Sequence, residues 1–168
     1  MSPACRTSRS PDETRALGAK LGALLPAGTV LALTGSLGAG KTVFVQGLAR
    51  GLGVDPREPV VSPTFVLLRT YTGRVPLYHL DAYRLAGAGE LLDLGVLDFL
   101  GAEGQGVTAL EWADRVPEAL PVPRLELVLE VVGESERELT LSVVASDSPV
   151  GARYIVPLQQ IVEAWAKA

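Results

Sequence analysis

The spacing of apolar and polar residues divides the chain into short helices and strands in mixed order. Leucines recur at helical spacing between Leu17 and Leu24, which predicts a helix over residues 10–25. Its start is marked by Ser10, a typical N-cap, and by Pro11, a typical first helical residue. The pattern therefore places a helix ahead of the first strand.

Apolar runs bounded by glycine and proline predict the remaining elements. In chain order they are a buried strand over 29–33, a helix over 43–50, a β-hairpin of 65–71 and 75–80, short helices over 90–94 and 96–100, a buried strand over 107–110, a β-hairpin of 124–132 and 137–144, and a short helix after Pro157. The second hairpin alternates between apolar and polar residues, which is typical of strands with one face in water.

One run of eight residues, Gly35-Ser-Leu-Gly-Ala-Gly-Lys-Thr42, lies between the first predicted strand and the next helix. It fits G-x-x-x-x-G-K-[ST], the phosphate-binding P-loop. In this motif the backbone N–H groups point at phosphate oxygens, the lysine reaches the β- and γ-phosphates, and the threonine hydroxyl binds Mg²⁺. The chain has only three lysines, against twelve arginines, and places one of them here. We therefore expect a nucleotide to be bound by Gly38, Ala39, Gly40, Lys41, Thr42 and Val43.

These elements predict an α/β protein: a single-domain P-loop NTPase fold with a central, mostly parallel sheet, added β-hairpins and flanking helices. We expect a disordered N-terminal tail over residues 1–9 and a P-loop ATPase domain over 10–145. Residues 146–168 are expected to form a C-terminal extension with a short helix.

Composition narrows the functional classes. A net charge of −4 and a pI of about 5.0 argue against a stand-alone nucleic-acid binder, so DNA is not an expected partner. No apolar run approaches the roughly 18 residues that span a membrane. The one cysteine, Cys5, excludes a disulfide framework. We expect a cytoplasmic protein.

Two acids end apolar runs and are candidates for the Mg²⁺ site of a P-loop enzyme: Asp81 and Glu111. The alternative for each is an exposed acid in a turn. His79 precedes Asp81 by two residues, so both share a face if the chain is extended there. A lone histidine is more often structural than catalytic. Arg84 is placed to reach a phosphate or to pair with Asp81.

Ser62-Pro63-Thr64 follows the P-loop by about twenty residues. Its Thr64 hydroxyl is a candidate sensor of Mg²⁺ and the γ-phosphate, as in switch loops. The alternative is an ordinary entry into a strand. The chain contains no asparagine and so lacks the Asn-Lys-x-Asp run with which guanine-specific P-loop proteins read the base. ATP is therefore favoured over GTP.

Four blocks of the sequence resemble the TsaE family (also called YjeE), small bacterial P-loop ATPases. They are Gly35 to Thr42, Ser62-Pro-Thr-Phe65 running to Tyr71, Tyr78-His-Leu-Asp-Ala-Tyr-Arg-Leu85, and Leu110-Glu-Trp-Ala113. The resemblance covers about residues 10–145. Phe65 stands where the family commonly has tyrosine, and residues 146–168 extend past the usual core.

The resemblance implies site residues beyond the P-loop. Thr42 and Glu111 would bind Mg²⁺, and Asp81 would lie beside the γ-phosphate as a catalytic acid. Trp112 would lie near the nucleotide. Residues near Thr14 and Arg137 would approach the adenine side. The implied catalytic set is Lys41, Thr64, Asp81 and Glu111.

The resemblance also implies a role in tRNA modification. A TsaE-like protein would hydrolyse ATP weakly on its own and act with TsaD and TsaB. Those partners transfer the threonylcarbamoyl group to adenosine 37 of tRNAs that read ANN codons, so contact with tRNA would be indirect.

Two other functional classes remain open. A small-molecule kinase should carry an arginine-rich lid over the phosphates, and the stretch from Gly87 to Gly106 contains no arginine. A nucleotide-dependent binding module with negligible hydrolysis would use the same P-loop. This class overlaps with an ATPase that serves tRNA modification, because weak intrinsic hydrolysis is expected of that ATPase too.

Overall fold

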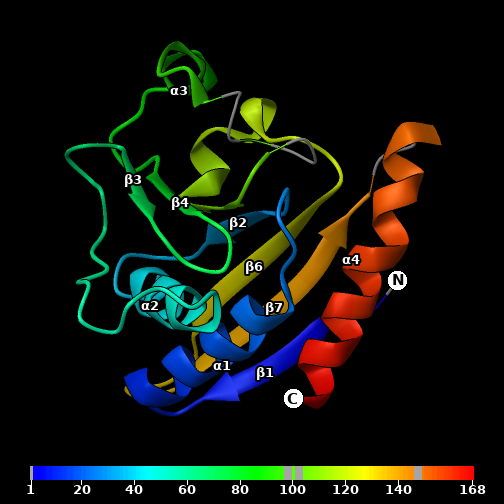
Figure 1. Cartoon of the computed structure of the whole chain (residues 1–168). Coiled ribbons are helices and arrows are strands. Elements are labelled where there is room, and N and C mark those ends of the chain that lie inside the picture. Colours follow the sequence, from blue (N-terminus) through cyan, green and yellow to red (C-terminus); the bar gives the residue numbers. More distant parts are fainter. Residues whose placement is uncertain (1, 97–99, 101–103, 146–148) are drawn as a thin grey trace.

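The computed structural model describes residues 2–96, 100, 104–145 and 149–168. Within them, seven strands form one sheet in the order β1-β7-β6-β2-β5-β4-β3 (Figure 1). The strands are β1 (Ala4–Ser8), β2 (Val30–Thr34), β3 (Leu68–Tyr71), β4 (Leu77–Asp81), β5 (Val107–Glu111), β6 (Arg124–Val131) and β7 (Arg137–Val144).

The sheet is parallel at its centre and antiparallel at its edges. Strand β2 pairs in parallel with β5 and β6, and β4 pairs in parallel with β5. The two hairpins, β3–β4 and β6–β7, extend the sheet on either side. The predicted α/β fold, with a central parallel sheet, added hairpins and flanking helices, is confirmed.

Helices cover both faces of the sheet. The α-helices are α1 (Pro11–Leu24), α2 (Lys41–Gly51), α3 (Ala88–Asp93) and α4 (Pro149–Lys167), and short 3-10 helices are η2 (Ala113–Arg115) and η3 (Pro117–Ala119). The expected helix over 96–100 falls largely outside the described residues. None of the described helices is long and apolar enough to cross a membrane.

Alternating side chains of the central strands enter two separate hydrophobic cores. On β2, Leu31 and Leu33 pack with α1, α2 and α4, whereas Ala32 packs on the opposite face with α3 and η2. The same division holds along β5, where Ala109 enters the first core and Leu110 the second. Both faces of the central strands are therefore dry, which explains their continuous apolar sequence.

The N-terminal segment corrects one prediction. Residues 4–8 are not a disordered tail but the edge strand β1, paired antiparallel with β7 from Ala4↔Leu141 to Ser8↔Arg137. Ala4 and Ser8 are buried, Arg6 is half-buried, and Cys5 and Thr7 are exposed. The polar side chains concealed this strand because backbone hydrogen bonds, which do not depend on side-chain type, hold it in place.

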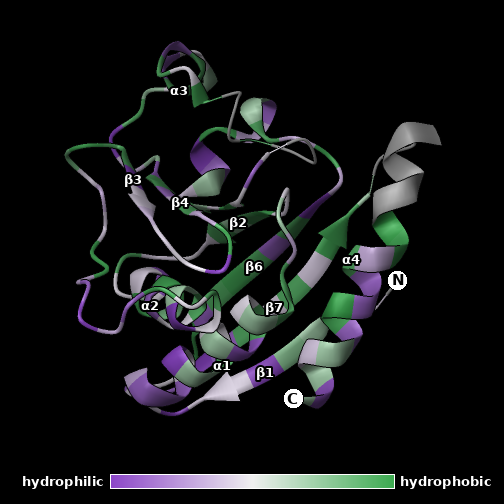
Figure 2. Ribbon diagram, viewed as in Figure 1, coloured by the Kyte–Doolittle hydropathy of each residue, from purple (hydrophilic) through white to green (hydrophobic). Residues whose placement is uncertain are grey.

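The C-terminal helix corrects a second prediction. It is not short and does not start after Pro157: α4 has 19 residues and contains that proline in its interior. Bands of hydrophobic and hydrophilic residues alternate along it (Figure 2). The Trp165 ring is fully buried, and its Nε1–H donates to the Leu17 carbonyl at 3.0 Å. This packing offsets the backbone hydrogen bond that the proline removes.

Helices α1 and α2 touch through glycine. A Cβ atom at Gly18 or Gly22 would lie 2.3 Å from a carbonyl oxygen of α2. At Gly47 it would lie 2.0 Å from the Arg15 carbonyl, and at Gly51 2.1 Å from the Ala19 carbonyl. Each distance is far below van der Waals contact, so only glycine allows the two backbones to approach this closely.

We expect Gly47→Ala to lower the free energy of unfolding by about 2–4 kcal/mol, because the added methyl group must push α1 away from α2. Urea denaturation measures this. The matched control is Gly89→Ala in α3, where a Cβ would meet nothing within 4 Å. Equal midpoints for the two variants would contradict the steric explanation.

Candidate functional site

The predicted P-loop connects β2 to α2. Gly40 precedes the helix at φ 105°, and Gly38 has φ 79°, both in the left-handed region that favours glycine. Helix α2 begins at Lys41, directly after the loop. The N–H groups in the first turn of α2 have no acceptor within the helix, and they lie at one end of the sheet.

A hollow of about 530 Å³ lies at this end of the sheet. Four segments that are distant in sequence meet there: the P-loop, the Ser62–Thr64 segment, the end of β4 and the end of β5. It is lined by Leu37, Gly38, Gly40, Lys41, Thr42, Val43, Ser62, Thr64, Asp81, Tyr83, Glu111 and Trp112.

The Lys41 ammonium lies inside this loop. Its Nζ donates to the carbonyls of Gly35 at 2.6 Å and Ser36 at 3.1 Å, and it stands 3.8 Å from the centre of the Trp112 ring. Burial lowers the pKa of Lys41, and the carboxylates of Glu111, Asp114 and Asp81 oppose that shift. Carbonyl groups and an aromatic face thus hold the Lys41 ammonium in a position where it can bind an anion.

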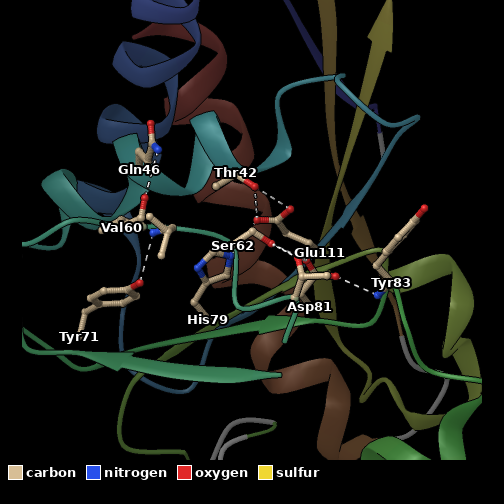
Figure 3. Close-up of polar contacts among 11 residues, drawn as sticks. Thr42, Gln46, Val60, Ser62, Tyr71, His79, Asp81, Tyr83 and Glu111 are labelled. Atoms are coloured by element: carbon tan, nitrogen blue, oxygen red, sulfur yellow. Dashed lines mark hydrogen bonds and ion pairs between the residues drawn. The ribbon is translucent and has the colours of Figure 1, made fainter. Parts of the chain in front are cut away.

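The side chains of Thr42 and Glu111 are hydrogen-bonded to each other. The Thr42 hydroxyl lies 2.9 Å from Glu111 Oε1 and 3.0 Å from Oε2 (Figure 3). Glu111 is 2% exposed and ends β5, directly opposite Asp81 at the end of the parallel neighbour β4. The two acids that ended apolar runs in the sequence therefore lie side by side.

The Asp81 carboxylate is held from three directions. Oδ2 accepts hydrogen bonds from the Ser62 hydroxyl at 2.5 Å and the Thr64 hydroxyl at 3.0 Å, and Oδ1 accepts from the Tyr83 N–H at 2.8 Å. The Ser62–Thr64 segment is thus more than a strand entry, because both of its hydroxyls reach the acid at the end of β4. The strand β3 itself begins only at Leu68.

His79 contacts Glu111, although it shares a strand face with Asp81. Its Nε2 lies 2.8 Å from Glu111 Oε1, and its side chain is fully buried (Figure 3). A carboxylate only accepts hydrogen bonds, so Nε2 carries the proton and donates. Within the described part of the chain, Nδ1 has no hydrogen-bond partner. His79 and Thr42 together fix the orientation of the Glu111 carboxylate.

Arg84 does not pair with Asp81. Its guanidinium lies over the Phe65 ring at 4.2 Å from the centroid. The Phe65 ring thus binds this cation through its face.

A second hollow, of about 250 Å³, adjoins the first through Gly38, Gly40 and Val43. Thr14 from α1 and Arg137 from β7 both line it. Arg137 Nη2 also donates to the Gly38 carbonyl at 3.3 Å, which ties the β6–β7 hairpin to the P-loop. The two residues that the resemblance assigned to the adenine side therefore lie together beside the phosphate-binding loop.

The sequence model of the family described as "Threonylcarbamoyl adenosine biosynthesis protein TsaE" matches residues 8–139. The chain belongs to the TsaE family. The matched range contains both hollows and the whole of β2 to β6, but only Ser8 of β1 and residues 137–139 of β7.

Individual TsaE relatives agree. The tRNA threonylcarbamoyladenosine biosynthesis protein TsaE of Treponema pallidum is 44% identical over 135 residues, which are 80% of this chain and 97% of that protein. The protein of the same name from Bacillus subtilis is 43% identical over 138 residues, which are 82% of this chain and 84% of that protein. The crystal structure of YdiB from Bacillus subtilis superposes with a TM-score of 0.76 at 35% identity, covering 96% of this chain and 95% of that one.

The TsaE motifs located most of the site, but sequence reasoning missed some of its residues. Tyr83 was missed: its N–H binds Asp81, and its ring lies 4.9 Å from that of Trp112. Gln46 was missed as well, although it stands one helical turn after Thr42 in an otherwise apolar run, and that spacing was a usable signal. The catalytic and ligand roles of the residues named from the sequence stay predictions.

We expect His79→Phe to lower the free energy of unfolding by about 2–4 kcal/mol, because the buried Glu111 carboxylate loses a donor. His79→Gln should cost less, since its amide can still donate. Urea denaturation measures both variants. In a Glu111→Gln background the cost of His79→Phe should shrink, and an undiminished cost would show that the histidine acts only by filling space.

Proposed function

We propose that the chain is a Mg²⁺-dependent ATPase that serves the threonylcarbamoyladenosine modification of tRNA. The observation that carries this proposal is the hydrogen bond from Thr42 of the P-loop to Glu111, in a hollow that Lys41 and Asp81 also line. Residues suited to phosphate and residues suited to a metal ion would therefore act at one point.

The phosphates would bind to the loop and to Lys41. First-turn amides of α2 and the lysine ammonium supply positive potential where the phosphate oxygens would lie. The hollow that Thr14 and Arg137 line would receive the base and ribose. ATP is favoured over GTP because the chain has no asparagine and so cannot form the guanine-reading run.

The residues present fit a magnesium ion that arrives with the nucleotide. No group of three or more His, Cys, Asp or Glu side chains forms a metal cage in the described residues. Mg²⁺ in phosphoryl-transfer enzymes typically takes one or two protein ligands and completes its shell with water and phosphate oxygens. The Thr42 hydroxyl and the Glu111 carboxylate would supply these ligands. When bound, the ion neutralises charge on the β- and γ-phosphates.

Hydrolysis would use Asp81 to orient the attacking water. Water would add to the γ-phosphorus, the bond from that phosphorus to the bridging oxygen would break, and ADP and phosphate would leave while the proton of the water passes to solvent. Ser62, Thr64 and the Tyr83 N–H hold the Asp81 carboxylate, so its remaining lone pairs point in a fixed direction. Lys41 would stabilise charge that develops on the departing oxygen.

The wider role rests on family membership. We propose weak intrinsic hydrolysis that increases in an assembly with TsaD and TsaB, in the cytoplasm and with only indirect contact with tRNA. The relatives named above are tRNA threonylcarbamoyladenosine biosynthesis proteins, which supports this role. The guanidinium of Arg84 lies on Phe65, so an arginine that completes the site would come from elsewhere.

We expect Lys41→Ala to weaken ATP binding by about tenfold to hundredfold, which corresponds to the loss of charge-assisted hydrogen bonds. Glu111→Gln should bind ATP with nearly equal affinity in the presence and absence of Mg²⁺. Isothermal titration calorimetry measures both, with Lys167→Ala as the control for removal of a lysine outside the hollow. Unchanged affinity in Lys41→Ala would overturn the proposal.

The tRNA role has its own test. Expression of this chain in bacterial cells depleted of their own TsaE protein should restore threonylcarbamoyladenosine, as measured by mass spectrometry of tRNA nucleosides. Lys41→Ala, expressed at the same level, should not restore it. A folded and expressed wild-type protein that fails to restore the modification would contradict this part of the proposal.

A further inference from the structure

The backbone just before the Ser62–Thr64 segment is held by two side chains outside the hollow. The Gln46 Nε2–H donates to the Val60 carbonyl at 3.1 Å, and the Val61 N–H donates to the Tyr71 hydroxyl at 3.4 Å (Figure 3). Gln46 comes from α2 and Tyr71 from β3. Two consecutive residues of the loop are thus clamped by two different elements.

Apart from the half-buried Val60 side chain and the buried Pro63, little of this loop packs against the rest of the protein. Residues 55–59 are exposed and Val61 is 43% exposed, while β3 starts only at Leu68. Leu67 has φ 67°, a left-handed conformation that costs a branched residue of the order of 1 kcal/mol. A loop with this strained residue keeps one path only where outside contacts hold it.

The orientation of Gln46 is itself determined. Its Oε1 accepts from Arg15 Nε at 3.1 Å, and Arg15 Nη1 in turn donates to Asp12 Oδ1 at 2.8 Å. Because the guanidinium can only donate, the amide oxygen must face Arg15 and the amide nitrogen must face Val60. Gln46 also lies one turn beyond Thr42, so α2 presents both the Thr42 hydroxyl, which would bind Mg²⁺, and the Gln46 amide on one face.

Tyr71 connects the same loop to the acids. Its side chain is 3% exposed, and its ring lies 6.5 Å, centroid to centroid, from that of His79, which binds Glu111. The ring that carries the Tyr71 hydroxyl is therefore buried and held in place. Its hydroxyl thus sets the position of Val61, the residue before Ser62.

We infer that Gln46 and Tyr71 are positioning residues that hold the Ser62–Thr64 segment against Asp81. Neither lines the hollow that would receive the phosphates, so they should govern the rate of hydrolysis and leave nucleotide affinity alone. When the clamp is lost, the Ser62 and Thr64 hydroxyls leave Asp81, and the carboxylate no longer has a fixed direction. This role rests on the proposed ATPase function.

Two substitutions of Gln46 separate its hydrogen bond to Val60 from its hydrogen bond to Arg15. Gln46→Glu keeps an acceptor for Arg15 but removes the donor to Val60. Gln46→Lys keeps a donor for Val60 but removes the acceptor for Arg15. The same two substitutions at Gln160, which is exposed on α4, are matched controls for the change of charge. Tyr71→Phe removes only the second clamp.

We expect Gln46→Glu and Tyr71→Phe each to lower the single-turnover rate of ATP hydrolysis about fivefold to tenfold, which corresponds to one hydrogen bond. Gln46→Lys should stay within about twofold of wild type. The dissociation constant for ADP, measured through Trp112 fluorescence, should stay within about twofold in all of them. Amide hydrogen exchange at Val61 and Ser62 should accelerate in Gln46→Glu and Tyr71→Phe only.

Three outcomes would overturn the positioning role. They are equal hydrolysis rates in Gln46→Glu and wild type, equal losses in Gln46→Glu and Gln46→Lys, or a loss of ADP affinity that parallels the loss of rate. A wild-type chain that neither binds nor turns over ATP would overturn the proposed function and this role with it. The exchange rates at Val61 would then still show whether the clamp exists.

Discussion

The close packing of α1 against α2 is the constraint on which the site depends. Gly18 and Gly22 on one helix meet Gly47 and Gly51 on the other at distances that leave no room for a methyl group. The P-loop runs into the first turn of α2, and Thr14 lies in α1. The helix contact therefore fixes the P-loop relative to the second hollow, and four glycines set the spacing of the residues that would bind the nucleotide.

Chemistry encoded by neighbouring residues was predictable from the sequence. The P-loop lies between a strand and a helix as its pattern requires, and Asp81 and Glu111 end adjacent parallel strands. Apolar runs with period-two or helical spacing fixed the order of the elements, because burial of one face is a local property of the sequence. The shared strand face of His79 and Asp81 was predicted from their spacing, but the partner of His79, Glu111, is on the neighbouring strand and was not.

Features that depend on distant segments were not predictable. The polar stretch that forms β1 is ordered by backbone bonds to β7, which lies more than a hundred residues later. Helix α4 runs through Pro157 because its apolar face, with Trp165, packs on α1 and β7. Likewise, Gln46 acquires meaning only when the chain folds back to bring Val60 beside it. Such contacts arise from tertiary packing, which no window of neighbouring residues contains.

The groups that would bind the nucleotide are also hydrogen-bonded within the protein. Lys41 donates to two carbonyls of its own loop, and Thr42 donates to Glu111. On the proposed function, phosphate and metal would have to compete with these contacts, so binding would exchange hydrogen bonds and gain less than the charges alone suggest. Inorganic phosphate, with few new contacts to offer, would compete poorly in such an exchange. A ligand that also filled the hollow beside Thr14 would compete better, so the proposed site would favour whole nucleotides.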